Sequence, residues 1–326
     1  MLATLFILFV SLLFSSCDNN VKVSENTFSL ISWNVQTLFD SVESGSEYLA
    51  FTKRYGWSKE RYNKRIQSLG EVLKKSEFSS ADVIFFQEVE NSRVLEDLLT
   101  EGLRRRGFIY FGVIECKEPI SVGFISKIKP FETIVHYADG QRAIMQLRFM
   151  LPHHTISIFN LHAKSNLGEE EENLRLRKEY ARYLNTLIKD NSDDKIIVLG
   201  DFNTTLRLDT LDMLSSSEAL SEKVIIKESS IPVSTTKEGT LNYSLYDPLL
   251  DSSLPFPGEG SYYYQGEWTR PDHILLSRAL IEVSSHMEIS IISDYTSDSR
   301  GLPYGYDTSL WSGYSDHFPL RLDLSF

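Results

Sequence analysis

Residues 195–203 read Lys-Ile-Ile-Val-Leu-Gly-Asp-Phe-Asn, and this stretch decides the fold. Its four consecutive apolar residues, 196–199, predict a buried strand of about five residues, because so short an apolar run cannot complete a helix. Gly200 ends the strand, and alternate residues of an extended chain face one way, so Asp201 and Asn203 lie on the same side. A carboxylate and a carboxamide there can orient a water or bind a cation, or they can form a turn in which each bonds its own backbone.

Polar side chains of the kind used in catalysis also end the other predicted strands. Strands are expected at 27–34, 82–88, 155–161, 274–277 and 318–324, and the polar residues at or beside them are Asn34, Glu88, His162, Asp272, Asp316 and His317. Each has a structural explanation of its own, such as a cap, a solvated turn or a satisfied core histidine. Because strand ends at one edge of a sheet converge, we expect all of them to meet in one site with Asp201 and Asn203.

The remaining predicted elements are helices, short strands and loops. Ser58 is expected to cap a helix over 58–75 that has Ile66, Leu69 and Val72 on one face. Further helices are expected over 93–105 and 169–189, strands over 108–113, 120–125, 131–137 and 143–149, surface loops over 40–57 and 293–314, and helical turns with loops over 206–264. The basic residues of the first helix either contact phosphates or form a solvated face; they are Lys59, Arg61, Lys64, Arg65, Lys74 and Lys75.

Composition bounds the domain organisation and the class of partner. The 326 residues are 42% hydrophobic and 24% charged, with no visible repeat or Pro- and Gly-rich linker, which favours one domain over two. The formal charge of −12 argues against a large, permanently basic nucleic-acid surface. It does not exclude an anionic substrate, because a bound divalent cation changes the local sign of the charge.

The N-terminus has the pattern of an export segment. The apolar stretch within residues 1–17 is shorter than the ~20 residues that span a membrane, and a polar segment follows at once. Small Ser15 and Ser16 before Cys17 resemble the bacterial lipobox, in which the cysteine becomes the lipidated first residue. Phe14 stands where leucine is usual and no lysine or arginine precedes the apolar run, so an ordinary secretory signal or an N-terminal anchor is the alternative.

The expected division of the chain follows from that segment: a signal peptide over 1–17, a short tether over 18–26 and a catalytic domain over 27–326. Cys116 is the only cysteine besides Cys17, so no disulfide is expected within the mature domain. We expect the Cys116 thiol to fill a buried space, because no histidine accompanies it in sequence.

Six short motifs, taken together, resemble the endonuclease/exonuclease/phosphatase superfamily, which includes pancreatic-type deoxyribonuclease, abasic-site repair endonucleases, neutral sphingomyelinases and inositol-polyphosphate phosphatases. The motifs occur in the family's order from about residue 27 to the end, and the run Tyr-Gln-Gly-Glu-Trp at 264–268 is similar to exported bacterial members. They are Ser32-Trp33-Asn34-Val35, Gln87-Glu88-Val89, Asn160-Leu161-His162, Gly200-Asp201-Phe202-Asn203, Asp272 before an apolar strand, and Ser315-Asp316-His317-Phe318-Pro319. Pro271-Asp272-His273 departs from the family's apolar residue, aspartate and aromatic residue.

The resemblance implies an α/β fold, a four-layer α/β/β/α sandwich of two mixed sheets packed face to face. It also implies a phosphoester hydrolase that requires Mg²⁺ or Mn²⁺, hard cations that prefer oxygen ligands and keep several waters. By the same resemblance Glu88 is the main metal ligand, with Asn34 and Asp316 nearby, directly or through water.

The other matched residues take roles in catalysis by the same analogy. Asp272 would bond the far nitrogen of His317, and His317 would activate the attacking water. Asp201 and Asn203 would orient the water and the phosphate, although Asp201 is also a candidate for the base. His162 and the family's phosphate-contacting arginine, placed at Arg142, would stabilise charge on the phosphate oxygens.

Three functions are possible. An exported nuclease acting on DNA or RNA comes first, and a lipid phosphodiesterase of the sphingomyelinase type, or an inositol-phosphate phosphoesterase, comes second. The lipid enzyme would want a protruding apolar hairpin, whereas the loops over 228–264 and 293–314 supply aromatic residues without a clear apolar run. A binding protein on an inactive hydrolase scaffold is disfavoured, because no expected catalytic position is lost. We expect a monomer held at the bacterial cell envelope through its N-terminal lipid, or secreted.

Overall fold

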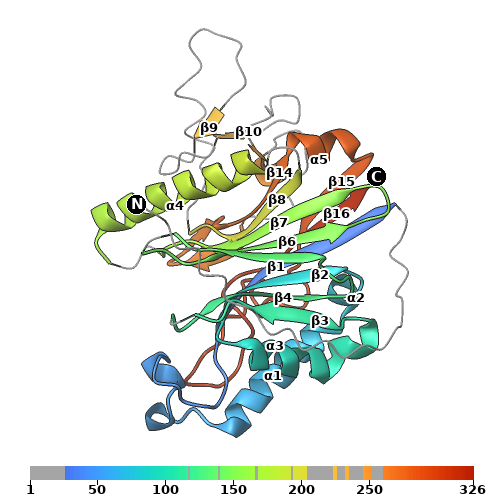
Figure 1. Cartoon of the computed structure of the whole chain (residues 1–326). Helices are drawn as coiled ribbons and strands as arrows, with labels where there is room; N and C mark the ends of the chain where they lie inside the picture. The colour runs from blue at the N-terminus through green and yellow to red at the C-terminus, as the bar shows by residue number, and fades with distance from the viewer. Residues whose placement is uncertain are drawn as a thin grey trace.

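Two mixed β-sheets pack face to face, and helices cover their outer faces (Figure 1). The computed structural model describes residues 26–116, 118–138, 140–165, 168–191, 194–203, 223–225, 232–234, 245–250 and 260–326. This architecture confirms the predicted α/β sandwich. The predicted signal peptide, the lipidation at Cys17 and most of the tether lie outside the described residues.

The first sheet carries β1 and β2, whose ends hold two of the predicted site residues. Its six strands are, in order, β15 (His286–Ile291), β16 (Leu320–Ser325), β1 (Thr27–Leu38), β2 (Val83–Val89), β4 (Ser121–Ser126) and β3 (Tyr110–Val113). β1 runs parallel to β2 and antiparallel to β16. The polar ends of β1 and β2 therefore lie at one edge, beside the chain that leads into β16.

The second sheet carries the stretch 195–203 at its centre. Among the described residues its eight strands are, in order, β5 (Glu132–His136), β6 (Ile144–Met150), β7 (Thr155–His162), β8 (Lys195–Asp201), β14 (Asp272–Ser277), β11 (Leu245–Tyr246), β10 (Pro232–Ser234) and β9 (Lys223–Ile225). β8 runs parallel to β7 and antiparallel to β14, with His162 opposite Asp201 and Asp201 opposite Asp272. The register alone thus aligns three of the predicted site residues.

The central strands are apolar on both faces because each sheet is covered on both sides. Alternate residues of the strands point between the sheets and form one core, which includes Phe28, Leu30, Val83, Phe85, Ile156, Ile158, Ile197 and Leu199. The intervening residues face the helices: Ile31, Trp33, Ile84 and Phe86 on the first sheet, and Phe159, Leu161, Ile196 and Val198 on the second. The uninterrupted apolar run at 196–199 is explained by this double burial.

The helices form the outer layers (Figure 1). α1 (Lys59–Leu73) begins after Ser58, whose hydroxyl accepts a hydrogen bond from the Arg61 amide at 3.3 Å, as predicted for a cap. α1 and α3 (Ser92–Leu98) pack on the first sheet, and α4 (Glu170–Asp190) packs on the second. The predicted helix over 93–105 is divided, because α3 passes into η3 (Leu99–Leu103) and η4 (Arg104–Arg106) with non-helical backbone at Gly102. No helix of the described residues is both long and apolar enough to cross a membrane.

Two expectations were wrong. Part of the segment 206–264, expected to form helical turns and loops, extends the second sheet through β9, β10 and β11, and only η7 (Pro248–Leu250) is helical among its described residues. The β-branched residues of β9 and β10 favour strands, which outweighed the polar composition of the segment. The other wrong expectation concerns Cys116, which is exposed, not buried. Two elements, α5 (Arg278–Val283) and β15, were not predicted.

Candidate active site

The polar ends of the two sheets meet in one buried cluster. The amide nitrogen of Asn34, on β1, donates to Glu88 Oε1 at 3.1 Å and to Asp201 Oδ2 at 3.0 Å. His162 Nε2 lies 3.6 Å from those same two carboxylate oxygens. Asn34 and His162 thus each lie close to both Glu88 and Asp201, and four residues from distant parts of the sequence meet, as their positions at strand ends predict.

Glu88 is held in an unusual backbone conformation. Its φ is +65°, and the pairing of β2 with both β1 and β4 shifts register next to it, which marks a β-bulge. A bulge re-aims a side chain that a regular strand would direct elsewhere, and a non-glycine residue at positive φ persists only when its surroundings hold it. Here the Thr37 amide donates to Glu88 Oε2 at 2.7 Å, so both carboxylate oxygens are oriented.

A buried arginine supports the turn that carries Thr37. Arg65, on α1, is 1% exposed and donates to the carbonyl oxygens of Val35 at 2.9 Å, Thr37 at 3.0 Å and Gln36. Gln36 and Thr37 both have positive φ. Burial lowers the pKa of Arg65 to about 10, which leaves the guanidinium charged at neutral pH. The turn that follows Asn34 and contacts Glu88 is thus held by a cation that has no carboxylate within ion-pair distance among the described residues.

A second buried network joins the two sheets behind the site. Gln87 Nε2 donates to Asn160 Oδ1 at 2.8 Å, and the Asn160 amide donates to the carbonyl oxygens of Phe86 and Gly123 at 3.2 and 3.0 Å. Gln87 precedes Glu88 and Asn160 stands two residues before His162. This amide bridge therefore fixes the end of β2 against the end of β7, which explains why these amides sit beside the site residues in the sequence.

His317 and Asp272 form a buried pair next to the first cluster. His317 Nδ1 lies 2.8 Å from Asp272 Oδ2, which also accepts a hydrogen bond from the Ser261 hydroxyl at 2.6 Å. The backbone of His317 is fixed by the Ser315 hydroxyl at 3.1 Å and by the indole of Trp33 at 3.0 Å. Because Nδ1 faces the carboxylate, Nε2 is the nitrogen left to face the substrate.

The charge state of the cluster follows from burial and from its neighbours. Burial and the nearby Asp272 carboxylate raise the pKa of Asp201 to about 7. Burial opposes the charged form of His317, but Asp272 outweighs it, and the pKa of His317 stands well above its usual value. Burial, with the cations of Arg142 and His317, holds the pKa of His162 well below its usual value, so this imidazole is neutral.

The remaining predicted residues lie around this centre. Asn203 donates from its amide side chain to the Ala163 carbonyl at 3.1 Å, and its backbone N–H donates to Asp201 Oδ1 at 2.7 Å. Arg142 donates to the same Ala163 carbonyl at 3.1 Å, next to His162. Asp316 Oδ1 lies 4.0 Å from His317 Nε2. The structure therefore brings all the predicted catalytic and ligand positions of the described chain to one place.

Gly200 permits this convergence. Its φ is +131°, and a Cβ atom there would lie 2.0 Å from the Leu161 carbonyl oxygen on β7. No side chain fits, so β7 and β8 approach closely at the point where His162 and Asp201 face each other.

The donor set suits a hard divalent cation. Oxygens of Glu88 and Asp201 lie with His162 Nε2 within 4.8 Å of one another, and carboxylate oxygens are the ligands that Mg²⁺ and Mn²⁺ prefer. Asn34 differs from its expected role as a ligand in one respect. Its Oδ1 accepts from the Gln36 amide at 3.0 Å, so the amide nitrogen and not the oxygen points to the carboxylates.

Comparison with known proteins supports the same class of site. The model of the Endonuclease/Exonuclease/phosphatase family matches residues 29–325. The chain belongs to this family. It is a metal-dependent phosphoester hydrolase, as the family and the site together require. No curated protein matches the sequence.

Several solved structures share the family fold at low sequence identity. D. rerio TDP2 complexed with a single-strand DNA product is 14% identical over 92% of this chain and 99% of that one, with a TM-score of 0.55. A Bacteroides thetaiotaomicron endonuclease/exonuclease/phosphatase family protein is 16% identical over 92% and 98%, with a TM-score of 0.56. The Neisseria 3′ phosphatase NExo bound to a product DNA hairpin is 14% identical over 92% and 100%, with a TM-score of 0.54. These likenesses confirm the fold of an endonuclease/exonuclease/phosphatase protein.

The sequence analysis did not identify the residues that position the active-site side chains or lie beside them. The active-site side chains and the turn beside them are positioned by Ser261, Gln36, Thr37 and the buried Arg65. The ring centroid of Tyr262 lies 4.7 Å from that of His317. One signal was available for Tyr262. Gln265-Gly266 between aromatic residues is a two-residue turn typical of a β-hairpin.

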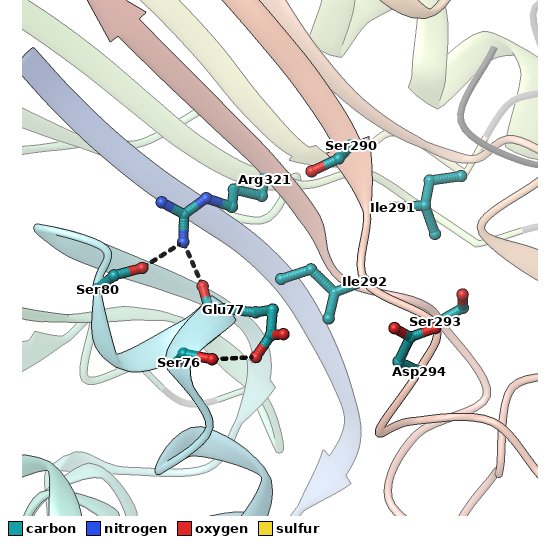
Figure 2. A pocket seen from close by; sticks show the side chains of 9 residues that line it. All are labelled: Ser76, Glu77, Ser80, Ser290, Ile291, Ile292, Ser293, Asp294 and Arg321. Atoms are coloured by element: carbon teal, nitrogen blue, oxygen red, sulfur yellow. Dashed lines mark hydrogen bonds between the residues drawn. The ribbon is translucent and has the colours of Figure 1, made fainter.

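A separate surface pocket of about 390 Å³ is not part of this site (Figure 2). It lies between α2 (Ser76–Ser79) and the edge formed by β15 and β16. The Arg321 guanidinium on its wall already donates to Ser80, at 2.8 Å, and to the Glu77 carbonyl, and it forms an ion pair with Asp323. None of the predicted site residues lines this pocket.

Proposed function

We propose that the chain is an exported, Mg²⁺-dependent phosphodiesterase that hydrolyses phosphodiester bonds of DNA or RNA. The observation that carries the proposal is that two groups of side chains lie together where the ends of the two sheets meet. Glu88 and Asp201 offer carboxylate oxygens, and the His317–Asp272 pair lies directly beside them. A site with an oxygen-lined cation position next to a carboxylate-oriented histidine suits water attack on phosphorus.

Each side chain has a role in this proposal. Glu88, Asp201 and Asp316 would hold Mg²⁺ or Mn²⁺, directly or through water, and Asn34 would fix the two carboxylates by its hydrogen bonds. The bound cation would supply Lewis acidity toward a phosphate oxygen and lower the pKa of a bound water. Asp272 would keep one proton of His317 on Nδ1. The positive charge of a bound cation would oppose a second proton on Nε2, so that Nε2 can accept a proton from the attacking water.

The residues on the other side of the centre would handle the phosphate. His162 and Arg142 would stabilise the charge that develops on its oxygens. Asn203, held at Ala163, would orient the phosphate and the water together with Asp201. If Glu88 and Asp316 hold the cation without Asp201, Asp201 is the alternative proton acceptor, since it is buried in the same cluster as Asp272 and His317.

Nucleic acid is favoured as the substrate because two of the compared proteins were solved with bound DNA products. The second candidate is a phospholipid or an inositol phosphate. Its support is the exposure of two apolar residues on the surface, Leu49 at 66% and Leu310 at 69%. Scattered exposed leucines are common on soluble proteins, so this support is weaker.

Export and anchoring form part of the proposal and rest on the sequence of residues 1–17. Lipidation of Cys17 would hold the enzyme at the bacterial envelope through several acyl chains, because a single chain binds a membrane only marginally. The Cys17→Ser variant should leave the detergent phase, and mass spectrometry of the native chain should find a diacylglyceryl adduct. An unmodified mature chain that begins at another residue would contradict lipidation.

The experiment that tests the function is a substrate panel with the full chain. Plasmid DNA, RNA and sphingomyelin vesicles are each incubated with Mg²⁺ or with EDTA, and Glu88→Gln serves as the inactive comparison. The proposal expects Mg²⁺-dependent cleavage of nucleic acid that Glu88→Gln loses. Mg²⁺-dependent release from sphingomyelin alone would assign the site to lipid instead.

A further inference from the structure

A β-hairpin rich in aromatic residues packs against His317 at one end and is exposed to solvent at the other. β12 (Tyr262–Tyr264) and β13 (Glu267–Thr269) form this two-stranded sheet. The Tyr262 ring centroid lies 4.7 Å from the His317 ring centroid, and the Tyr264 ring lies 6.2 Å from Tyr262 with only 19° between their planes. Three rings therefore follow one another outward from the histidine proposed to face the substrate.

The hairpin is held firmly, so the row of rings is fixed relative to the site. The backbone of Tyr262 bridges to His317, and the Phe318 amide donates to the Ser261 carbonyl at 2.7 Å. Gln265 and Gly266 both have positive φ, as a tight two-residue hairpin turn requires. The strand is therefore tied at its base to the same segment that carries the catalytic histidine.

Side chains alternate between the two faces of β12, and one of these faces packs against the protein. Tyr263 faces Trp268 at 5.2 Å, and Trp268 in turn lies 5.8 Å from Phe318, nearly parallel to it. Successive side chains of a strand point to opposite faces, so Tyr262 and Tyr264 share the other face. Tyr264 keeps 59% of its surface exposed, although it is a large aromatic residue on an ordered strand.

We infer that Tyr264 and Tyr262 form a stacking platform for the nucleobase beside the scissile phosphate, and that the preferred substrate is therefore a single-stranded or frayed nucleic acid. This inference rests on the proposed function. A nucleobase is a flat ring joined through its sugar to the phosphate, so a phosphate at His317 brings its base toward the adjoining rings.

The chemistry of the surface supports this occupant. The site is rich in carboxylates and the chain carries a formal charge of −12, so broad electrostatic attraction cannot supply the binding of a polyanion. Stacking on aromatic side chains works without charge and tolerates every base, because each base has a π-face. A base inside a duplex is already stacked on its neighbours, whereas an unpaired base is free to stack on the platform.

The test compares two single-stranded oligomers of equal length, one of thymidine nucleotides and one of abasic tetrahydrofuran units with the same phosphates. The wild-type chain with Mg²⁺ should show a kcat/KM for the base-bearing oligomer about 5- to 150-fold above that for the abasic one, the range that loss of one stacked base produces. Tyr264→Ala should bring this ratio toward one, and Tyr264→Phe should keep it. Phe131→Ala is the matched control, because Phe131 is 47% exposed but lies at the opposite end of the second sheet.

A spectroscopic measurement separates stacking from a general effect on the fold. An oligomer with 2-aminopurine as its base is bound to the Glu88→Gln chain, which leaves the substrate intact. Stacking quenches the fluorescence of this base, so the quench should persist with Tyr264→Phe added and fall with Tyr264→Ala added.

The outcomes distinguish the platform from the proposed function. If wild-type protein hydrolyses both oligomers at the same rate, or if Tyr264→Ala leaves the ratio and the quench unchanged, the platform is wrong while the nuclease stands. If no oligomer is hydrolysed, the proposed function fails and this inference fails with it. Sphingomyelin hydrolysis that falls with Tyr264→Ala, without an effect on oligomers, would assign the platform to a lipid.

Discussion

Replacing Arg65 by methionine should loosen the metal site without touching any residue that contacts the substrate. Methionine keeps most of the length of the side chain but removes the guanidinium. The carbonyl oxygens of Val35 and Gln36 then lose the guanidinium as their donor, whereas the Thr37 carbonyl keeps the Phe39 N–H at 3.1 Å. Thr37 also loses the support that aims its N–H at Glu88 Oε2, 2.7 Å away.

The expected loss of stability follows from these contacts. A buried polar group left without a partner costs about 1–3 kcal/mol, and the carbonyls of Val35 and Gln36 are affected. The Arg65 guanidinium also lies 3.9 Å from the centre of the Tyr306 ring, a contact worth about 1–2 kcal/mol when desolvated. The wild-type protein bears the cost of burying the cation, which offsets part of this sum. We expect a net loss of about 3–5 kcal/mol in the free energy of unfolding.

Two measurements check the Arg65 prediction. Urea unfolding in EDTA should show the loss of stability, and calorimetric titration with Mn²⁺ should show a 10- to 100-fold weaker affinity, the usual effect of disturbing a group that orients a metal ligand. Lys64→Met is the control, because Lys64 is exposed on the same helix and its loss should change stability by less than about 0.5 kcal/mol. An Arg65→Met chain with wild-type stability and wild-type Mn²⁺ affinity would refute the supporting role of the arginine.

Three further predictions concern other parts of the structure. Gly200→Ala should destabilise the fold by more than about 3 kcal/mol in urea unfolding, because its Cβ would lie 2.0 Å from the Leu161 carbonyl oxygen; a change below about 1 kcal/mol would show that β7 and β8 can separate freely. His317→Ala should lower kcat about 10²- to 10⁴-fold, and combining it with Asp272→Asn should add little, since residues acting as a unit are non-additive; losses that multiply would give the two residues independent roles. Burial raises the pKa of Asp82 in the folded protein, so protonation of this carboxyl stabilises the folded state. The stability that it contributes is fully present below the unfolded pKa of 3.8 and is lost as the pH rises through the folded pKa. Asp82→Asn should remove this fall from the pH dependence of unfolding, and identical pH curves for the two proteins would contradict it.

The meeting of the site residues could be predicted because the sequence itself shows where each buried strand ends. A buried apolar run followed by a polar residue fixes both the strand and the place where it stops, as at Asp201 and Glu88. The family's order of motifs then indicates which strands are neighbours. Neither argument indicates that Glu88 sits on a bulge with positive φ, because that conformation depends on contacts from Asn34 and the turn after it.

Arg65 shows why the supporting residues were harder to find. The sequence places it among the basic residues of a helix, where a solvated face or phosphate contact is the natural interpretation. Its spacing from Tyr62 and Leu69 nevertheless puts it on the buried face of α1. The partners that make burial tolerable are backbone carbonyls and the ring of Tyr306, which lie about 30 and 240 residues away along the chain. Such partners cannot be recognised from local sequence.

The central claim is that a divalent cation held by Glu88 is required for phosphoester hydrolysis. The most direct measurement is the rate of bis(p-nitrophenyl) phosphate hydrolysis as Mg²⁺ is added back after EDTA, for the wild-type chain, Glu88→Gln and the control Glu96→Gln on the exposed side of α3. The wild-type and control proteins should recover fully, whereas Glu88→Gln should stay at least about 100-fold slower at every Mg²⁺ concentration, since the cation supplies several kcal/mol of transition-state stabilisation. Full wild-type activity in excess EDTA, or a Glu88→Gln chain that reaches the wild-type rate, would contradict the account.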